Sequence, residues 1–271
     1  MIIRKSPAKI NLFLNIIEKR DDGYHNIETY FQFINLYDVI HINSIPGNVI
    51  EFSSNNKSLS GSNNLCVKAA EILRDYIKPK NSLNASIKLI KNIPIGAGLG
   101  GGSSNAATIL LGLNDLWQCN LKKSELISLG KELGSDVPVF INGFSAFGFD
   151  TGISLVQHSI EKKFFLVIYP RIHVSSKIMY SKYKIKDCIK HINLDNMHHN
   201  IGYNSFEELL CFEHPEIKEL LNLLRKNGNG SISGSGSCLF SIFDNEESAR
   251  NMSKFIPNKY QTYIVHSLNR I

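Results

Sequence analysis

The segment Pro94–Ser104 constrains this chain more than any other part of the sequence. It reads Pro-Ile-Gly-Ala-Gly-Leu-Gly-Gly-Gly-Ser-Ser, follows an apolar strand pattern over residues 85–90, and precedes apolar residues spaced three and four apart from Ala106 to Trp117. The pattern predicts a strand, a glycine loop and a helix N-terminus in succession. Glycines adopt positive φ angles and let the backbone approach a ligand, so the amides of such a loop favour an anion at the helix dipole. We therefore expect a phosphate-binding loop.

Two common phosphate motifs fit this loop poorly. Gly96, Gly98 and Gly101 satisfy G-x-G-x-x-G, but the loop lies near residue 100 and no acidic residue closes a following strand about 20 positions later. The P-loop pattern is absent because no lysine follows these glycines. A nicotinamide oxidoreductase is therefore disfavoured, and a phosphoryl transferase has to draw its lysine from elsewhere in the chain.

Length and composition indicate a globular protein. The 271 residues are 43% hydrophobic and 20% charged, which supports a packed core in one large or two smaller domains, and we expect two. No apolar run approaches the roughly 18 residues of a membrane span. Arg4 and Lys5 before the apolar stretch 10–17 imitate a secretory signal, but asparagines interrupt that stretch, so we interpret it as a strand of the fold.

Cysteine and charge patterns exclude further classes. The five cysteines are odd in number and scattered, which predicts neither a disulfide framework nor a zinc knuckle and is typical of a reducing cytoplasm. The net charge of +6 comes from dispersed lysines, so nucleic-acid binding is not expected. Adjacent imidazoles in Met197-His198-His199 lack a third ligand nearby, and we interpret them as part of a polar loop.

The remaining pattern predicts interleaved strands and helices. The first 60 residues favour strands, and Asn63 or Asn64 is a candidate cap for the helix that follows. Asp244 with Glu247 is a candidate capping box for a helix that buries Phe255. Low periodicity over 151–163 marks a domain boundary. The other expected helices cover 65–76, 124–133 and 215–226; the expected strands cover 164–169, 231–232, 238–243 and 260–265, with a second glycine loop at 233–237.

Several segments together resemble the GHMP kinases, the family that includes galactokinase, homoserine kinase and mevalonate kinase. The Pro-x-x-x-Gly-Leu-Gly-Gly-Gly-Ser-Ser-Asn-Ala-Ala pattern over 94–107 is similar to that family's phosphate loop. Pro7–Leu12 and Asp22–His25 are similar to the branch that phosphorylates a cytidine-diphospho methylerythritol in non-mevalonate isoprenoid biosynthesis. Gly234–Cys238 is similar to the family's third motif, so the resemblance extends from residue 7 to residue 238.

The resemblance implies an α+β, two-domain GHMP kinase fold. The expected domains are a ribosomal-protein-S5-like α/β domain over 1–155 and a ferredoxin-like α+β domain over 156–271, with the active site between them. The implied reaction moves the γ-phosphoryl group of ATP to the 2-hydroxyl of the cytidine-diphosphate substrate, giving ADP and the 2-phosphate, with Mg²⁺ as cofactor. A small-molecule substrate, no nucleic-acid or membrane partner, and a monomer or homodimer are expected in the cytoplasm.

The resemblance also implies two catalytic residues. A tertiary alcohol needs a destination for its proton, and Asp136 in Gly134–Pro138 matches the family's base. Lys9 matches the lysine that would keep this carboxylate ionised and offset charge on the phosphoryl group. Without the resemblance, Asp136 would be interpreted as a helix-end carboxylate bound to nearby amides, and Lys9 as a solvated residue on a strand edge.

The remaining site residues follow from the same resemblance. Tyr24 and His25 are expected against the cytosine and Asn11 near the methylerythritol hydroxyls, whereas His25 alone would be interpreted as a surface residue. Tyr180 is expected on the other face of the base. Ser104 is a candidate Mg²⁺ ligand, and Asn204 receives no role. The residues expected to bind ATP are Pro94, Ile95, Gly96, Ala97, Gly98, Leu99, Gly100, Gly101, Gly102, Ser103 and Ser104.

Two alternatives remain open from the sequence. The chain could be another small-molecule GHMP kinase with a mevalonate-type or sugar-type acceptor. It could also be a catalytically inactive nucleotide-binding protein on the same fold, although the presence of both Lys9 and Asp136 argues against this.

Overall fold

The computed structural model describes residues 1–47, 49–59, 61, 64–78, 83–185, 191–192 and 199–271. The chain forms two compact units that alternate along the sequence, and the long strands β1 (Ile2–Lys19) and β2 (His25–Asn43) contribute residues to both. These units differ from the expected domains 1–155 and 156–271, whose boundary stays a prediction. The first unit comprises Met1–Ala8, Leu36–Ile93 and Gly100–Gly143; the second comprises Lys9–Asn35, Pro94–Leu99 and Phe144–Ile271.

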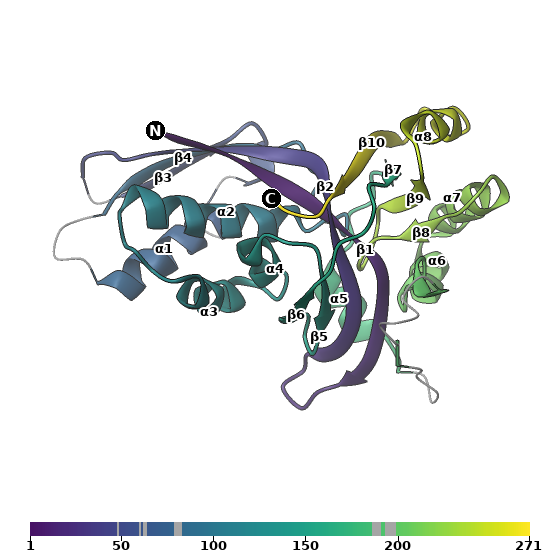
Figure 1. Ribbon diagram of the computed structural model, residues 1–271, viewed down its shortest axis with the longest axis horizontal. Coiled ribbons are helices and arrows are strands. Elements are labelled where there is room, and N and C mark those ends of the chain that lie inside the picture. The colour runs from purple at the N-terminus through teal and green to yellow at the C-terminus, as the bar shows by residue number, and fades with distance from the viewer. Residues whose placement is uncertain (48, 60, 62–63, 79–82, 186–190, 193–198) are drawn as a thin grey trace. The chain divides into compact units, whose positions relative to one another are not determined.

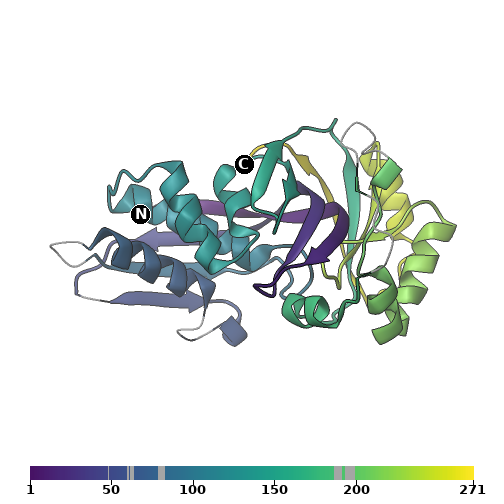
Figure 2. The ribbon, with the colours of Figure 1, turned by 90° about the horizontal axis from the view of Figure 1, so that it is seen from below.

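The first unit combines a small sheet with a layer of helices. Strand β4 pairs antiparallel with β2 and parallel with β3, and the crossover from β3 to β4 contains α1. Helices α1, α2 and α3 pack against one another and lie on one side of these strands (Figures 1 and 2). The elements are β3 (Ile50–Ser54), η1 (Lys57–Leu59), α1 (Leu65–Ile77), β4 (Ala85–Ile90), α2 (Gly101–Leu116), α3 (Lys123–Leu133) and α4 (Val137–Asn142).

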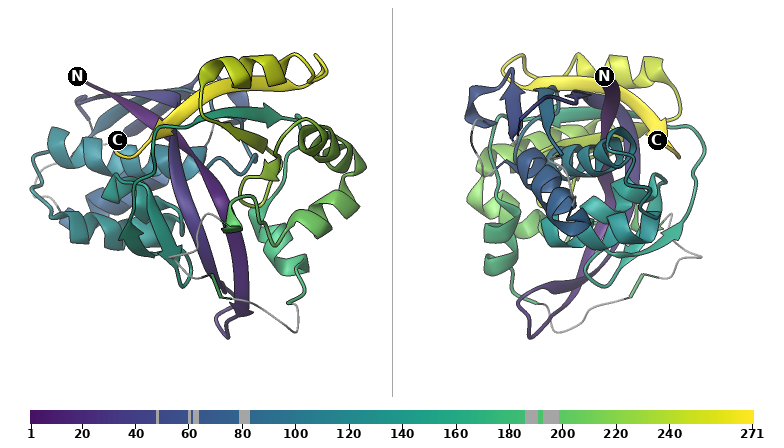
Figure 3. Two further views of the ribbon diagram at one scale, coloured as in Figure 1. Left: turned by 45° about the vertical axis from the view of Figure 1, so that its right-hand side comes forward. Right: turned by 90° about the vertical axis from the view of Figure 1, so that its left-hand side faces the viewer.

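The second unit is built on an antiparallel sheet with the strand order β2-β10-β7-β9-β8. Strand β5 pairs antiparallel with another part of β2. Figure 3 shows α7 and α8 alongside this sheet. The elements are β5 (Ala146–Phe149), β6 (Ser154–Gln157), β7 (Phe164–Tyr169), α5 (Ser176–Lys182), α6 (Glu207–Glu213), α7 (Pro215–Lys226), β8 (Ser231–Ile232), β9 (Leu239–Phe243), α8 (Glu246–Ser253) and β10 (Gln261–Leu268).

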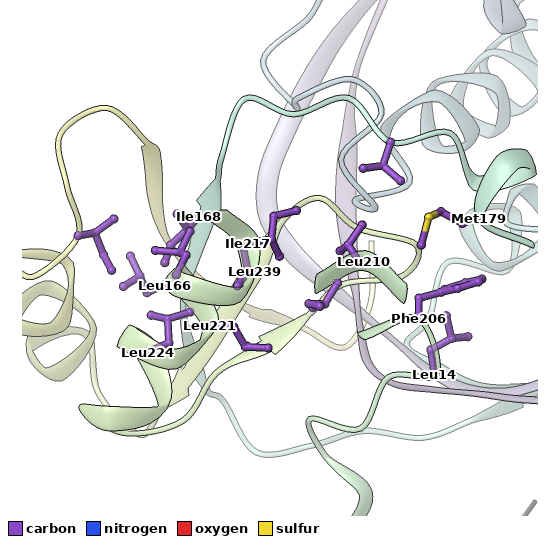
Figure 4. Packing of buried hydrophobic residues seen from close by; sticks show 14 of the residues in the cluster. Leu14, Leu166, Ile168, Met179, Phe206, Leu210, Ile217, Leu221, Leu224 and Leu239 are labelled. Atoms are coloured by element: carbon purple, nitrogen blue, oxygen red, sulfur yellow. The ribbon is translucent and has the colours of Figure 1, made fainter. Parts of the chain in front are cut away.

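The core of the second unit lies between one face of this sheet and its helices. Leu166 and Ile168 alternate with residues on the opposite face of β7 and pack toward Leu221 and Leu224 of α7 (Figure 4). Both residues of α7 belong to its apolar stripe, which the three- and four-residue spacing predicts. The cluster continues to Phe206, which is fully buried. The apolar faces of sheet and helices therefore determine how this unit packs.

Most of the elements expected from the pattern are confirmed, and the start of the chain is a strand of the fold. Asn64 caps α1, because its Oδ1 accepts a hydrogen bond from the Cys66 amide at 2.8 Å. The predicted cap of α8 is wrong by one residue: Asn245 accepts from the Ser248 amide, whereas Asp244 pairs with Lys163. In the described part of the chain, no helix is long and apolar enough to span a bilayer.

Three other details differ from the prediction. Phe255 lies beyond the end of α8 and is 60% exposed, so its predicted burial is wrong. The stretch 151–163 contains the short strand β6, which its weak pattern did not predict. Pro138 lies in the first turn of α4, a helix that directly follows Asp136 and was not predicted. Met197 and His198 of the predicted polar loop lie outside the described residues.

Candidate active site

Two glycine loops contact each other in the second unit. A Cβ atom on Gly98 would lie 2.0 Å from the Ser233 carbonyl oxygen, and the φ angle of Gly98 is +76°, so both space and backbone conformation require glycine there. The Ser233 hydroxyl donates to the Gly98 carbonyl at 3.0 Å, and the Cys238 amide donates to the Ala97 carbonyl at 3.1 Å. The sequence predicted both loops, and the structure shows that they pack together.

Backbone hydrogen bonds hold the first loop at both ends. The Lys9 amide donates to the Leu99 carbonyl at 3.0 Å, and the Val174 amide donates to the Gly96 carbonyl at 2.9 Å. A Cβ atom on Gly96 would lie 2.2 Å from the imidazole of His173, so this close approach also depends on glycine. These contacts fix the backbone before a ligand arrives, as a preorganised anion site requires.

Lys9 and Asn11 are buried side chains of β1. Their exposed fractions are 4% and 3%, which excludes a solvated edge position for Lys9. The Lys9 ammonium donates to Asn11 Oδ1 and lies 5.5 Å from the centroid of the Phe31 ring. A Cβ atom on Gly234 would lie 3.4 Å from Lys9 Nζ. Lys9 is therefore a cation beside both glycine loops.

The start of α2 contains Gly100 as its N-cap, with a φ angle of +67°. Ser104, one turn into the helix, is fully buried, and its hydroxyl lies 2.7 Å from the hydroxyl of Ser6. Asn105 donates from Nδ2 to the same Ser6 hydroxyl at 3.0 Å. The Ser104 hydroxyl is thus used within the protein, and its role as a Mg²⁺ ligand stays a prediction.

Asp38 joins the two ends of the glycine loop, a role that sequence reasoning missed. Its Oδ1 accepts from the amides of Asn92 and Ile93 at 2.7 and 2.8 Å, just before the loop. Its Oδ2 accepts from the Lys91 ammonium and, at 2.8 Å, from Asn105 Nδ2, just after the loop. The side chains of Asp38 and Lys91 are 0% and 5% exposed. An aspartate inside an alternating strand was the signal available in the sequence.

Asp136 precedes α4 and is partly buried. Its side chain makes no capping hydrogen bond to the described residues of this helix. The structure therefore does not support helix capping as the reason for an aspartate here, and the catalytic role of Asp136 stays a prediction.

His25 is a buried histidine with an open hydrogen-bonding position. It is 5% exposed, and among the described residues its Nε2 atom has no hydrogen-bond partner. Burial, followed by the nearby charge of Lys19, lowers the pKa of His25 below its ordinary value of 6.5, so the neutral imidazole is favoured. Tyr24, its neighbour, is 61% exposed. An imidazole edge and an exposed phenol ring thus lie in adjacent positions.

Tyr180 packs directly on His25. Their ring centroids are 5.2 Å apart with an interplanar angle of 35°, a contact distance that leaves no room for a base between the two rings. Tyr180 also meets Phe206 edge to face at 4.8 Å. In this conformation Tyr180 supports the His25 ring, and its role against the cytosine stays a prediction.

Asn204, for which the sequence pattern predicted no role, binds the second glycine loop. It is 5% exposed and donates from Nδ2 to the carbonyls of Ile232 and Gly234 at 2.9 and 2.8 Å. Its Oδ1 accepts from the Phe206 amide at 2.8 Å. Both Nδ2 hydrogens and the Oδ1 atom form hydrogen bonds inside the protein, so Asn204 fixes the loop beside Lys9.

Comparison with known proteins gives the family. The model for the N-terminal domain of GHMP kinases matches residues 64–144, and the model for their C-terminal domain matches residues 185–262. The chain is similar to the 4-diphosphocytidyl-2-C-methyl-D-erythritol kinase of Marinomonas sp. (strain MWYL1), with 38% identity over 97% of this chain and 86% of the relative. The enzyme of the same name from Wigglesworthia glossinidia brevipalpis is also 38% identical, over 97% of this chain and 88% of the relative.

A solved structure agrees with these relatives. The crystal structure of a 4-(cytidine 5'-diphospho)-2C-methyl-D-erythritol kinase matches with a TM-score of 0.85 and 28% identity, covering 98% of this chain and 99% of that chain. The match confirms the expected α+β GHMP kinase fold. Because sequence similarity, both domain models and the fold agree, this chain belongs to the GHMP kinases and, among them, to the family of 4-diphosphocytidyl-2-C-methyl-D-erythritol kinases.

Proposed function

We propose that this chain transfers the γ-phosphoryl group of ATP to the 2-hydroxyl of 4-diphosphocytidyl-2-C-methyl-D-erythritol, giving ADP and the 2-phosphate for isoprenoid precursor synthesis. The observation that carries the proposal is the position of Lys9. This buried cation bonds through its amide to Leu99 of the first loop, and its ammonium lies beside Gly234 of the second. Such an arrangement suits a polyanionic phosphate chain, and the activity for which the relatives are named indicates the acceptor.

The residues divide the proposed chemistry among themselves. The amides of residues 94–104 hold the triphosphate, and the Lys9 charge offsets the negative charge that develops on the moving phosphoryl group. As the oxygen of the 2-hydroxyl bonds to the γ-phosphorus, Asp136 accepts the proton of that hydroxyl. The bond from that phosphorus to the bridging oxygen breaks, and the electron pair leaves with ADP.

His25 and Tyr24 support the choice of a cytidine substrate. A neutral imidazole has one donor and one acceptor nitrogen, and the open Nε2 of His25 can hydrogen-bond the edge of a cytosine. The exposed ring of Tyr24 offers a face on which the base can stack. Asn11 is proposed near the methylerythritol hydroxyls. A mevalonate-type acceptor would leave both aromatic side chains without a use.

Mg²⁺ belongs to the proposal as the usual companion of ATP. The part of the chain that the structure describes contains no group of three or more His, Cys, Asp or Glu side chains that could hold a metal ion. Magnesium is often bound by substrate phosphates and water with one or two protein ligands, so these residues do not form a complete site by themselves. We assign no catalytic step to the ion.

Oligomeric state and location are part of the same proposal. We propose a monomer or homodimer in the cytoplasm, acting on a small molecule. Cys66, Cys119, Cys211 and Cys238 are free thiols, which suits a reducing compartment. Sedimentation of the purified chain measures its oligomeric state directly.

The acceptor is tested by comparing specificity constants. ATP consumption is measured with the cytidine substrate, mevalonate, galactose and homoserine, and kcat/KM is expected to be highest for the cytidine substrate by several orders of magnitude because the site's polar groups match its base. A higher kcat/KM with mevalonate would overturn the acceptor assignment. ATP binding without turnover of any acceptor would favour the catalytically inactive alternative.

The proposed base is tested by Asp136→Asn. Its kcat is expected to fall by about two orders of magnitude or more, because the amide cannot accept the proton, while the Kd for ATP changes little. Asp75→Asn is the matched control, since Asp75 is an exposed carboxylate on α1. Equal kcat values for the two variants would remove Asp136 from the mechanism.

A further inference from the structure

Three buried polar side chains in the second unit form a directed chain of hydrogen bonds. The Thr29 hydroxyl donates to the Phe13 carbonyl at 2.6 Å and accepts from Asn11 Nδ2 at 2.8 Å. Asn11 Oδ1 in turn accepts from the Lys9 ammonium. Thr29, Asn11 and Lys9 are 1%, 3% and 4% exposed, so water does not readily replace any of these contacts.

The single hydrogen of a hydroxyl gives this chain its direction. Because Thr29 donates its hydrogen to Phe13, it can act only as an acceptor toward Asn11. Asn11 must therefore present its NH₂ group to Thr29 and its carbonyl oxygen to Lys9. An ammonium can only donate, so a flipped amide would place its NH₂ group against the Lys9 ammonium and its oxygen against the acceptor side of the Thr29 hydroxyl. Thr29 thus determines which end of the Asn11 amide faces the lysine.

In the second unit, the Lys9 ammonium contacts two neutral groups. The Asn11 amide directs the ammonium, and the Phe31 ring at 5.5 Å adds a favourable contact with its face. Both groups are neutral, so these two contacts orient the Lys9 ammonium and add no negative charge. Small errors in the position of such a charge lower the rate, because phosphoryl transfer depends mainly on positioning and electrostatics.

We propose that Thr29 is a positioning residue for phosphoryl transfer: through Asn11, its hydroxyl fixes the Lys9 ammonium beside the two glycine loops. The proposal rests on the function proposed above, in which Lys9 acts on the transferring group. It assigns the threonine no contact with ATP or the acceptor, so its effect is expected on kcat rather than on ATP binding.

The test compares Thr29→Val with Thr29→Ser. Valine keeps the shape of threonine but removes the hydroxyl, so kcat is expected to fall about 5- to 30-fold, with KM for ATP within twofold. Serine keeps the hydroxyl but loses a buried methyl group, so kcat is expected within about twofold of wild type although stability decreases. If kcat decreased in parallel with stability in both variants, instead of decreasing only where the hydroxyl is removed, the proposal would be overturned.

A double-mutant comparison asks whether Thr29 acts through Lys9. In a Lys9→Met background, adding Thr29→Val is expected to change the residual kcat less than twofold, because the group that it positions is absent. The same 5- to 30-fold loss in both backgrounds would show that Thr29 acts by another route, and would overturn the proposal.

A readout without turnover separates this proposal from the function itself. The ¹⁵N signal of the Lys9 ammonium, assigned by its loss in Lys9→Met, is expected to shift or broaden in Thr29→Val and to keep its wild-type position in Thr29→Ser. An unchanged signal in Thr29→Val would contradict the positioning role. A wild-type enzyme inactive on the cytidine substrate would instead contradict the proposed function, whatever the signal shows.

Discussion

Lys91 and Lys9 both have buried side chains, but the groups that they contact differ. In the first unit, Lys91 is 5% exposed in its side chain and pairs with Asp38, whose carboxylate also accepts from two backbone amides and Asn105. In the second unit, Lys9 is 4% exposed and donates to the neutral amide of Asn11. The contact of Lys91 with Asp38 is an ion pair, and the contact of Lys9 with Asn11 is a hydrogen bond to a neutral amide.

This difference indicates what each lysine does. A buried ion pair gains Coulomb energy but loses hydration, so its main effect is to make removal of either partner costly. Lys91 and Asp38 join the residues before the glycine loop to the helix after it, which is a structural task. An ammonium oriented by an amide keeps its attraction for an anion. We therefore expect stability to depend on Lys91 and catalysis to depend on Lys9.

The largest expected effect is on stability, in Lys91→Met. The substitution leaves Asp38 buried without its cation, so the free energy of unfolding should fall by about 3–5 kcal/mol. Urea unfolding followed by circular dichroism measures it. Lys91→Met/Asp38→Asn also removes the carboxylate charge and should recover part of the loss. A loss below about 1 kcal/mol in the single variant would show that the pair does not stabilise the loop.

The next effect is on catalysis, in Lys9→Met. Loss of a charge aimed at the transferring group should lower kcat about 10²- to 10³-fold, which corresponds to about 3–4 kcal/mol of transition-state stabilisation. The free energy of unfolding should fall by about 1–3 kcal/mol, less than in Lys91→Met, because buried Asn11 Oδ1 loses its donor. Lys88→Met, on the exposed side of β4, is the control. A kcat within threefold of wild type would show that Lys9, like Lys91, has a structural role and not a catalytic one.

The two regions also show how much the sequence could predict. The glycine loops and their helix followed from local spacing, because apolar periodicity and backbone freedom depend on neighbouring residues. The burial of Lys9 did not follow from local spacing, because the groups around its side chain are Asn11, Phe31 and a glycine loop more than 200 residues away in the sequence. On local pattern alone Lys9 was a solvated residue, and only the family resemblance indicated a catalytic role.

The Asp38 network illustrates the same limit. Asp38 bonds to Lys91 and Asn105, which lie 53 and 67 positions away in the sequence. No periodicity links residues at such separations, so the network could not be predicted, although a single aspartate in an apolar strand is unusual. The prediction of the cap of α8 was wrong for a smaller reason. Asp244 and Asn245 are both good caps, and which of them caps the helix depends on the contact between Asp244 and Lys163.

His25 shows a third way to bury a basic group, which is to keep it neutral. Burial, then Lys19, lowers its pKa in the folded state below 6.5, so the unfolded chain binds more protons as the pH falls through 6.5. His25 should therefore cause the protein to lose stability between pH 7.5 and pH 5.5. Urea unfolding at both pH values should show a smaller loss in His25→Gln than in wild type. Equal losses would mean that His25 is not desolvated.

The smallest effect is expected where the cation is exposed. Arg250 and Glu246 form an ion pair one turn apart on α8, with side chains 63% and 47% exposed. Water already solvates both groups, so Arg250→Gln should change the free energy of unfolding by only about 0.3–0.5 kcal/mol, and less in high salt. The same urea measurement applies. If this variant lost as much stability as Lys91→Met, burial would not explain why the Lys91–Asp38 pair stabilises the protein. The difference between Lys91 and Lys9 would then depend only on the geometry of their contacts.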